Sequence, residues 1–281
     1  MGQEDTRCIQ GRARWDPRSL RGDPSVSGVL PIAIEEAVKI LRILTHTAKE
    51  YIALMELHKL VGDERLYEVI EMFRGEIYQR PPLRSSVKRS LRIRRVHKIE
   101  IIDKRDRWVL MRIETDPGTY IRKIIHDIGL LLGVRAHMRE LRRIKSGIFT
   151  EDLNLVTLHM LSEAMYIYKN ENKDDLLRKY IMPIEVGVAH LPKIIVDTNA
   201  VDPIARGAQL AVPGISVIDK SIARGDLLAI LSPKAELVAI ARAELSAEEI
   251  ITREKGIAAT TLRVIMRPGL YPRWIKKEKK I

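Results

Sequence analysis

Cysteine is almost absent from this sequence: Cys8 is the only one in 281 residues. A disulfide within the chain and a zinc site built from several cysteines are therefore excluded. No apolar run reaches the roughly 20 residues that cross a bilayer, and the opening segment MGQEDTRCIQ lacks the apolar core of a signal peptide. These absences predict a cytoplasmic protein that has no membrane partner.

Asparagine and glutamine are scarce as well, with four of each. Lysine, arginine and glutamate are abundant, and this combination is typical of proteins from thermophiles. The 49 Lys and Arg outnumber the 37 Asp and Glu, which leaves a net charge of +12. A cationic surface attracts polyanions. Composition alone leaves two interpretations open, a nucleic-acid-binding protein and a basic protein without such a partner.

The apolar pattern predicts an unstructured segment over residues 1–22 and ordered structure after it. From His190 onward, short apolar runs such as 227–231 and 237–243 alternate with Gly- and Pro-containing turns, which predicts a small β-barrel. The expected helices are 35–44, 63–73 with Gly75 as its C-terminal cap, 118–132 after a turn, 157–168 and a short one ending at 180. The expected strands are 50–57, 96–103 and 108–114. The segment 136–144 is either a strand or a helix.

Five segments, in this order and spacing, carry a family resemblance. They are DPSVSGVLPIA (23–33), KEYIALM (49–55), GEIYQRPPLRSSVK (75–88), GTYIRKIIHDIG (118–129) and AHMRELRRIKSG (136–147). Together they resemble the TruB-type pseudouridine synthases, and most of all the archaeal dyskerin-like branch that acts with H/ACA guide RNAs. RGAQLAVPGI (206–215) and RGDLLAI (224–230) resemble the PUA domain of that branch.

The resemblance implies an α+β fold. A catalytic domain at 23–188, with a mixed, mainly antiparallel sheet flanked by helices, would be followed by a PUA β-barrel at 189–274 and a basic tail at 275–281. Members of the family have about sixty further residues before the segment that matches 23–33. We therefore expect the first strand and helix of the catalytic sheet to be missing and residues 1–22 to be aberrant.

A frame error in the gene would explain why residues 1–22 do not match the family. With suitable codons, a shift of one base within GRARWDPRSL (11–20) gives GHGGTLDP, the family's own motif. Resequencing the gene tests this hypothesis.

The resemblance also implies the chemistry, which detaches uracil from its ribose and rejoins it through carbon without a metal or an organic cofactor. Asp23 matches the essential aspartate, although an Asp-Pro pair is usually only a turn. Tyr51 matches the tyrosine that packs on the target base, Arg122 the arginine that pairs with the aspartate, and Leu141 a leucine that lines the base pocket. Without the resemblance, Tyr51 would be read as a strand tyrosine that faces the core and Leu141 as a core leucine. An Arg inside the apolar helix 118–132 would be costly to bury unpaired, which independently favours a carboxylate partner for Arg122.

Basic residues then become candidate RNA contacts. In the family, the segment that begins at Arg80 forms a flexible loop over the substrate, and the run over 84–98 contains no acidic residue. A second basic cluster lies at 139–145, and a third candidate face lies in the PUA-like unit. The histidines lack metal-ligand spacing. The residues predicted to contact RNA are Arg80, Pro81, Arg84, Lys88, Arg89, Arg92, Arg94, Arg142, Arg143, Arg206, Gly207, Gln209, Pro213 and Gly214.

The predicted function is the isomerisation of specific uridines in ribosomal RNA, with tRNA as a further substrate. The expected partners are an H/ACA guide RNA, the substrate RNA and the small protein subunits of the same ribonucleoprotein. A catalytically dead RNA-binding scaffold and a fragment that does not fold stably are the alternatives.

Overall fold

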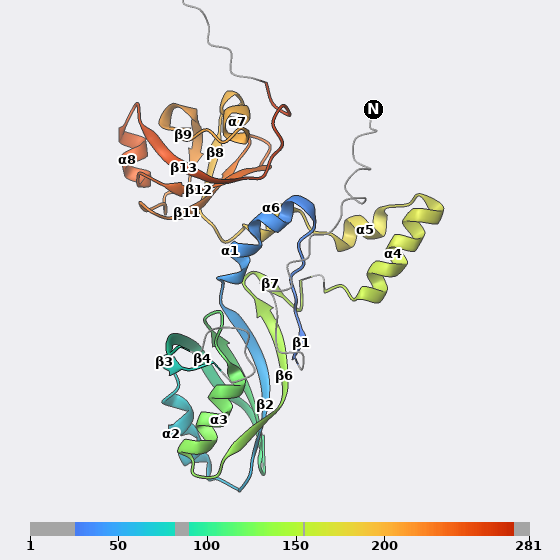
Figure 1. The fold of residues 1–281 in the computed structure, drawn as a ribbon, viewed down its shortest axis with the longest axis vertical. Helices are drawn as coiled ribbons and strands as arrows, with labels where there is room; N and C mark the ends of the chain where they lie inside the picture. Colours follow the sequence, from blue (N-terminus) through green and yellow to red (C-terminus); the bar gives the residue numbers. More distant parts are fainter. Residues whose placement is uncertain (1–25, 82–89, 154, 273–281) are drawn as a thin grey trace, which may run out of the picture. The chain divides into compact units, whose positions relative to one another are not determined.

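The computed structural model describes residues 26–81, 90–153 and 155–272 (Figure 1). These residues divide into two compact units. The N-terminal unit comprises the described residues within 26–32 and 41–180, and the C-terminal unit comprises 33–40 together with 181–272. The expectations for residues 1–22, Asp23, Arg84, Lys88 and Arg89 and for the tail at 275–281 fall outside the described residues.

A mixed sheet organises the N-terminal unit. Its strands are β1 (Val26–Gly28), β2 (Lys49–Leu57), β3 (Gly75–Gln79), β4 (Arg92–Arg105), β5 (Trp108–Thr115), β6 (Ala136–Ser146) and β7 (Phe149–Thr150). Its helices are α1 (Leu41–Thr45), α2 (Asp63–Glu71), α3 (Ile121–Leu131), α4 (Leu158–Glu171) and α5 (Asp175–Tyr180). The strand order is β1-β6-β2-β5-β4-β3, with β7 beside β6. Only the β1–β6 pair is parallel among these strand pairs, so the prediction of a mixed, mainly antiparallel sheet is confirmed.

Amphipathic periodicity explains why α2 and α3 lie together on one face of this sheet (Figure 1). The buried face of α3 is formed by residues spaced three and four apart: Ile121, Ile124, Ile125 and Ile128. They pack in one core with alternate residues of β2 (Ala53, Met55 and Leu57) and of β5 (Val109, Met111 and Ile113). The alternation along each strand selects which face is buried.

The C-terminal unit contains a second sheet. Its strands are β8 (Lys193–Val196), β9 (Leu210–Ala211), β10 (Ile215–Ile218), β11 (Leu227–Leu231), β12 (Leu237–Ala243) and β13 (Ile257–Val264), in the order β10-β8-β11-β12-β13-β9. Its helical segments are η2 (Glu35–Ile40), α6 (Ile184–Gly187), α7 (Thr198–Ala205), η3 (Val212–Gly214) and α8 (Ala247–Thr252). The edge strands β9 and β10 are joined through the three residues of η3, so the sheet must curl until its edges meet, which agrees with the predicted small barrel.

Two local predictions differ from the structure in detail. The segment expected to be a helix over 35–44 is helical, but its first part is the 3-10 segment η2 and only the rest is the α-helix α1. Gly75 does not cap the helix before it: α2 ends at its C-cap residue Met72, and Gly75, with a φ of +95°, begins β3. A glycine suits both places because it adopts a positive φ without strain, so the sequence could not separate them.

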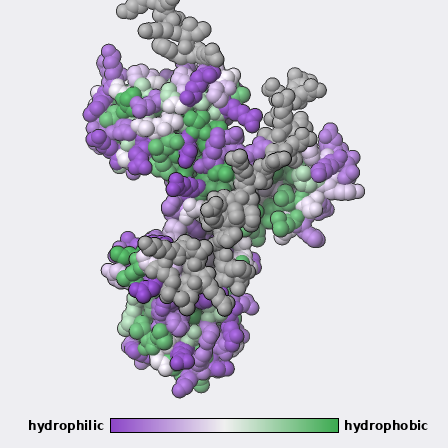
Figure 2. Space-filling model, in the orientation of Figure 1, coloured by the Kyte–Doolittle hydropathy of each residue, from purple (hydrophilic) through white to green (hydrophobic). Residues whose placement is uncertain are grey.

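The region 136–144, left open as strand or helix, is part of strand β6. The helix predicted over 157–168 is α4, and Thr157 is its N-cap, accepting a hydrogen bond from the Met160 amide. None of the described helices is long and apolar enough to cross a membrane. On the face seen in Figure 2, hydrophilic residues cover most of both units and hydrophobic residues form small scattered groups.

Candidate active site

Three adjacent strands bring the predicted site residues into neighbouring rows of the N-terminal sheet. β6 lies between β1 and β2. Leu141 of β6 pairs with Val26 of β1, and two residues later Arg143 pairs with both Gly28 of β1 and Tyr51 of β2. Side chains two residues apart on a strand share a face, so Leu141 and Arg143 point to the same side. Leu141 and Tyr51 both contact the core beneath α2 and α3.

A buried arginine connects this row to the main chain of the segment after β1. The Arg143 side chain is only 7% exposed, and its Nε donates a 2.6 Å hydrogen bond to the Val29 carbonyl. Tyr51 is the residue of β2 that pairs with Arg143, so the two side chains lie side by side on one face of the sheet. Burial raises the pKa of Tyr51, while the charge of Arg143 acts against that rise. Tyr51 is thereby a neutral phenol near pH 7.

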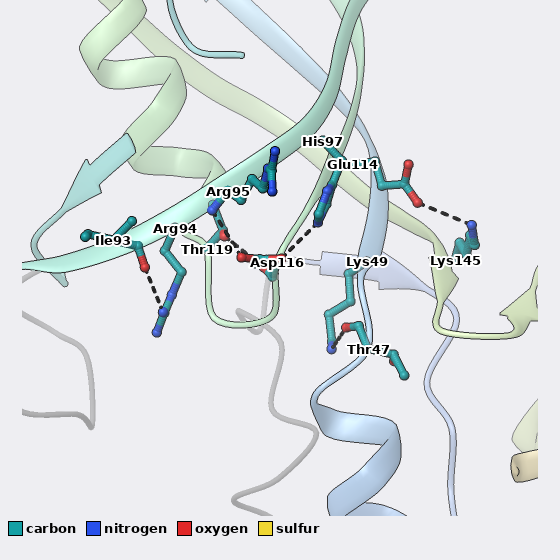
Figure 3. Close-up of polar contacts among 10 residues, drawn as sticks. All are labelled: Thr47, Lys49, Ile93, Arg94, Arg95, His97, Glu114, Asp116, Thr119 and Lys145. Atoms are coloured by element: carbon teal, nitrogen blue, oxygen red, sulfur yellow. Dashed lines mark hydrogen bonds and ion pairs between the residues drawn. The ribbon is translucent and has the colours of Figure 1, made fainter. Parts of the chain in front are cut away.

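Lys49 begins β2 two residues before Tyr51 and is also partly buried. Its Nζ donates to the carbonyls of Thr45 and Thr47, at 3.1 and 3.0 Å, and Figure 3 shows the contact with Thr47. Burial lowers the pKa of Lys49 to about 8, with a further contribution from the positive charge of Arg143. The site therefore contains an amine that titrates near neutral pH.

Arg122 is the second residue of α3 and is exposed. The expectation that its guanidinium is buried inside an apolar helix was wrong, because it lies in the first turn of α3, off the buried face. The physical reason given for a carboxylate partner therefore falls away. Its family role stays a prediction, since Asp23 lies outside the described residues.

The segment that enters α3 is tied to β3 through a side-chain amide. Gln79, the last residue of β3, is 3% exposed. Its Oε1 accepts a hydrogen bond from the Tyr120 amide at 2.9 Å, and its Nε2 donates to the Tyr120 carbonyl at 3.2 Å. Tyr120 is the N-cap residue of α3, so this pair of bonds sets where the helix that carries Arg122 begins.

The same segment is also tied to β4 through Asp116, which follows β5. Its carboxylate accepts hydrogen bonds from the Arg95 amide, at 3.3 Å, and contacts His97 Nε2 at 2.9 Å (Figure 3). The Thr119 hydroxyl donates to the Asp116 carbonyl at 2.8 Å, which closes the turn before α3. The start of α3 is therefore held to both strands of the β3–β4 hairpin.

A separate group of candidate residues lies in the C-terminal unit, at the end of α7 and in the loop after it. Arg206 is the C-cap of α7, and its Nε donates a 2.8 Å hydrogen bond to the buried carboxylate of Asp202. Gly207 has a φ of +94°, which a residue with a side chain rarely adopts. Gln209 and Pro213 are exposed, and Gly214 accepts a hydrogen bond at its carbonyl from the Asp197 amide.

Comparison with known proteins shows what this chain is similar to. Residues 192–265 match the PUA domain, residues 122–189 the C-terminal domain of tRNA pseudouridylate synthase B, and residues 22–131 the C-terminal part of Pus10. A "Probable tRNA pseudouridine synthase B" from Pyrococcus furiosus is 47% identical over 258 residues, which cover 92% of this chain and 76% of that protein. A relative of the same name from Saccharolobus solfataricus is 49% identical over 251 residues, 89% of this chain and all of that one.

This chain belongs to the TruB family of pseudouridine synthases. Two solved structures show the same fold. One, described as a Cbf5-Nop10-Gar1 complex, has a TM-score of 0.84 and 47% identity, covering 91% of this chain and 78% of that one. The other, described as an H/ACA RNP bound to a substrate RNA containing 2'-deoxyuridine, has a TM-score of 0.84 and 44% identity, covering 90% and 77%. The N-terminal unit contains the pseudouridine synthase sheet, and the C-terminal unit contains the PUA domain. The predicted boundary between residues 188 and 189 stays a prediction.

The basic residues of this pseudouridine synthase chain occupy several different environments. Arg80 is exposed, whereas Pro81 is buried. Arg92 and Arg94 are partly exposed and belong to β4, which begins earlier than the strand predicted at 96–103. Arg142 is exposed and forms a 2.7 Å ion pair with Glu151. Their contacts with RNA stay predictions.

Arg143 does not fit the RNA-contact role that the sequence predicted for it. Its guanidinium is buried among protein groups, because alternation along β6 turns it to the side opposite its neighbour Arg142. Sequence reasoning also missed Gln79, Tyr120 and Asp116 as residues that hold the site. Their only signal was that they lie in or beside the motifs QRPP and GTYIR, because their contacts join segments that are 41 residues apart for Gln79 and Tyr120 and 21 and 19 residues apart for Asp116. Among the described residues, no group of three or more His, Cys, Asp or Glu is placed to hold a metal ion.

Proposed function

We propose that this chain is the catalytic subunit of a guide-RNA-dependent pseudouridine synthase, which isomerises chosen uridines of ribosomal RNA. Its partners would be an H/ACA guide RNA, the substrate RNA and small protein subunits. The likeness to chains described as part of an H/ACA RNP and of a complex with Nop10 and Gar1 supports this proposal. Guide pairing would select the uridine, so the protein need not read the target sequence.

The reaction rearranges atoms within one nucleotide. The bond between C1′ of the ribose and N1 of uracil breaks, the base turns, and a bond forms between C1′ and C5. C5 loses a proton and N1 gains one, so the product is an isomer of the substrate. The target uridine must leave its helix to reach the protein, which costs a few kcal/mol. An aromatic ring stacked on the extruded base offsets about 1–3 kcal/mol of that cost.

The row formed by Tyr51, Arg143 and Leu141 beside β1 is the observation that carries the proposal. In it, the Tyr51 ring stacks on the base and Leu141 lines the space for it. Asp23 precedes Val26, the first residue of β1, by three positions in the sequence. By the family resemblance, its carboxylate would act as nucleophile or stabilise the charge on the ribose.

The RNA would lie across the basic residues of the N-terminal unit, while the PUA domain binds the guide. The exposed arginines, Arg80 and Arg142 among them, are suited to phosphate contacts. Arg206 to Gln209 and the loop at Pro213 to Gly214 would hold a guide stem and its 3′ ACA. A cytoplasmic location belongs to this proposal. A second candidate substrate is tRNA, because the curated relatives are named for tRNA.

A tritium-release assay tests the proposal. The full chain is assembled with an H/ACA guide RNA and its small protein subunits, and is given a target RNA labelled at C5 of the uridine. Release of tritium with the matching guide, but not with a mismatched guide, is expected. Release from tRNA without any guide would favour the second substrate. Binding of the guide without any release would indicate a dead scaffold, and a chain with no cooperative thermal unfolding would indicate a fragment.

A further inference from the structure

The adjacent residues Arg142 and Arg143 on β6 have opposite surroundings. Arg142 has a side chain that is 53% exposed and paired with Glu151. Arg143 is 7% exposed. A guanidinium is costly to remove from water unless hydrogen bonds replace those it loses. The contacts that Arg143 makes inside the protein are therefore the ones that explain its burial.

Those contacts join two elements of the candidate site. One is the hydrogen bond from Nε to the Val29 carbonyl, at 2.6 Å, immediately after β1. The other is with Tyr51, its paired residue on β2, whose pKa the charge of Arg143 acts to lower. Because β6 lies between β1 and β2, a side chain on β6 is the one that can reach both neighbours.

The main chain at Arg143 is equally close to β1. The Val29 amide donates to the Arg143 carbonyl at 2.8 Å. Gly28 has a φ of +99°, and a Cβ at that position would stand 2.1 Å from the same carbonyl oxygen. Backbone and side chain of Arg143 thus hold Val29 through two separate hydrogen bonds, and the approach leaves no room for a side chain at residue 28.

We propose that Arg143 is a positioning residue for the isomerisation. Its guanidinium binds the main chain at Val29 beside Tyr51, its paired residue on β2, and so sets the tyrosine ring relative to β1, the strand that begins three residues after Asp23. This inference rests on the proposed function, in which the Tyr51 ring stacks on the target base. Arg143 itself touches neither base nor phosphate. A ring that tilts or shifts by about an ångström loses much of the alignment that a bound nucleotide requires.

Single-turnover kinetics of the assembled complex separate positioning from RNA binding. Arg143→Gln should lower the rate at saturating enzyme by about tenfold or more, since misplacements of about an ångström can cost up to a hundredfold, while the Kd for substrate RNA stays within about twofold. Arg142→Gln should show the contrasting pattern, with a larger loss in affinity than in rate. A fall in affinity with an unchanged rate for Arg143→Gln would overturn the proposal and restore Arg143 as an RNA contact.

A double-mutant cycle shows whether Arg143 acts through Tyr51. Tyr51→Phe keeps the stacking ring and removes only the hydroxyl on which Arg143 acts. In that background Arg143→Gln should cost markedly less than it costs alone, because the group through which Arg143 acts is already gone. Fully multiplicative losses would overturn the link to Tyr51. If Arg143→Gln fails to fold, Arg143→Lys takes its place in the same cycle, because it keeps the charge but cannot reach both partners.

Titration of Tyr51 supplies a readout that needs no turnover. The ring is labelled with ¹³C at Cζ, and its signal is assigned by its loss in Tyr51→Phe. Since Arg143 acts to lower the pKa of Tyr51, Arg143→Gln should move the titration to higher pH, and an unmoved titration would overturn the contact. A wild-type complex without turnover would count against the proposed function, whereas this titration would still decide the placement of Arg143.

Discussion

The side-chain amide of Gln79 accepts one hydrogen bond from the Tyr120 backbone and donates another to it. Two residues of neighbouring strands pair in the same way, through their backbones. The Gln79 amide accepts from the Tyr120 N–H at 2.9 Å and donates to the Tyr120 carbonyl at 3.2 Å. Gln79 is the last residue of β3, and Tyr120 caps α3. A movement of the β3–β4 hairpin would therefore be transmitted to the start of α3.

Gln79→Leu should destabilise the N-terminal unit by about 1–3 kcal/mol, because the Tyr120 N–H loses its partner and the Tyr120 carbonyl loses one of the hydrogen bonds it accepts. It should also lower turnover, since the start of α3 is no longer held in place. Thermal or urea unfolding and the tritium assay measure the two effects. Glu76→Gln, at an exposed position of the same strand, is the matched control and should change neither. An unfolding free energy equal to that of the wild type would show that water replaces the amide.

Gly28→Ala should be strongly destabilising, because its Cβ would stand 2.1 Å from the Arg143 carbonyl oxygen. Gly75→Ala is the matched control: its φ of +95° is almost that of Gly28, at +99°, but nothing lies within 4 Å of its added Cβ. The control should lose only about 1–2 kcal/mol from backbone strain. Denaturant unfolding of both variants isolates the contact, and equal losses would mean that β1 can move away from β6 without cost.

Lys49 should make stability rise with pH above 8. Its pKa is about 8 in the folded chain and 10.5 when unperturbed. Between these values the unfolded chain binds more protons at this residue, so the unfolding free energy increases with pH over that window. Because other groups titrate too, the measurement is the difference between wild type and Lys49→Met. That difference should shift in favour of the wild type from pH 8 to 10, and a constant difference would place the pKa of Lys49 outside this window.

Binding of guide RNA should weaken steeply with salt, because phosphate contacts release counterions. Arg206→Gln in the PUA domain should lower the guide affinity and reduce the slope of log K against log salt by about 0.7–0.9. It should also destabilise the C-terminal unit, since the carboxylate of Asp202 is only 3% exposed and loses its ion pair. Salt-series binding and thermal unfolding measure both effects. Loss of stability without any change in slope would limit Arg206 to a structural role.

The sequence by itself determined the family and most of the regular structure. The motifs around Tyr51, Arg122 and Leu141 identified a TruB-type enzyme, and apolar periodicity located β2, α2, α3 and the paired strands β11 and β12. These features depend on spacing within one segment, and hydrophobic burial imposes the same spacing wherever such a segment packs.

Only the tertiary structure decided which arginines face solvent and which segments meet. The sequence left 136–144 open as strand or helix, and the strand β6 turns Arg142 and Arg143 to opposite faces. The bonds from Gln79 to Tyr120 and from Arg143 to Val29 join residues 41 and 114 positions apart. Local propensity carries no information about such pairs, because strand order and register arise from packing of the whole sheet.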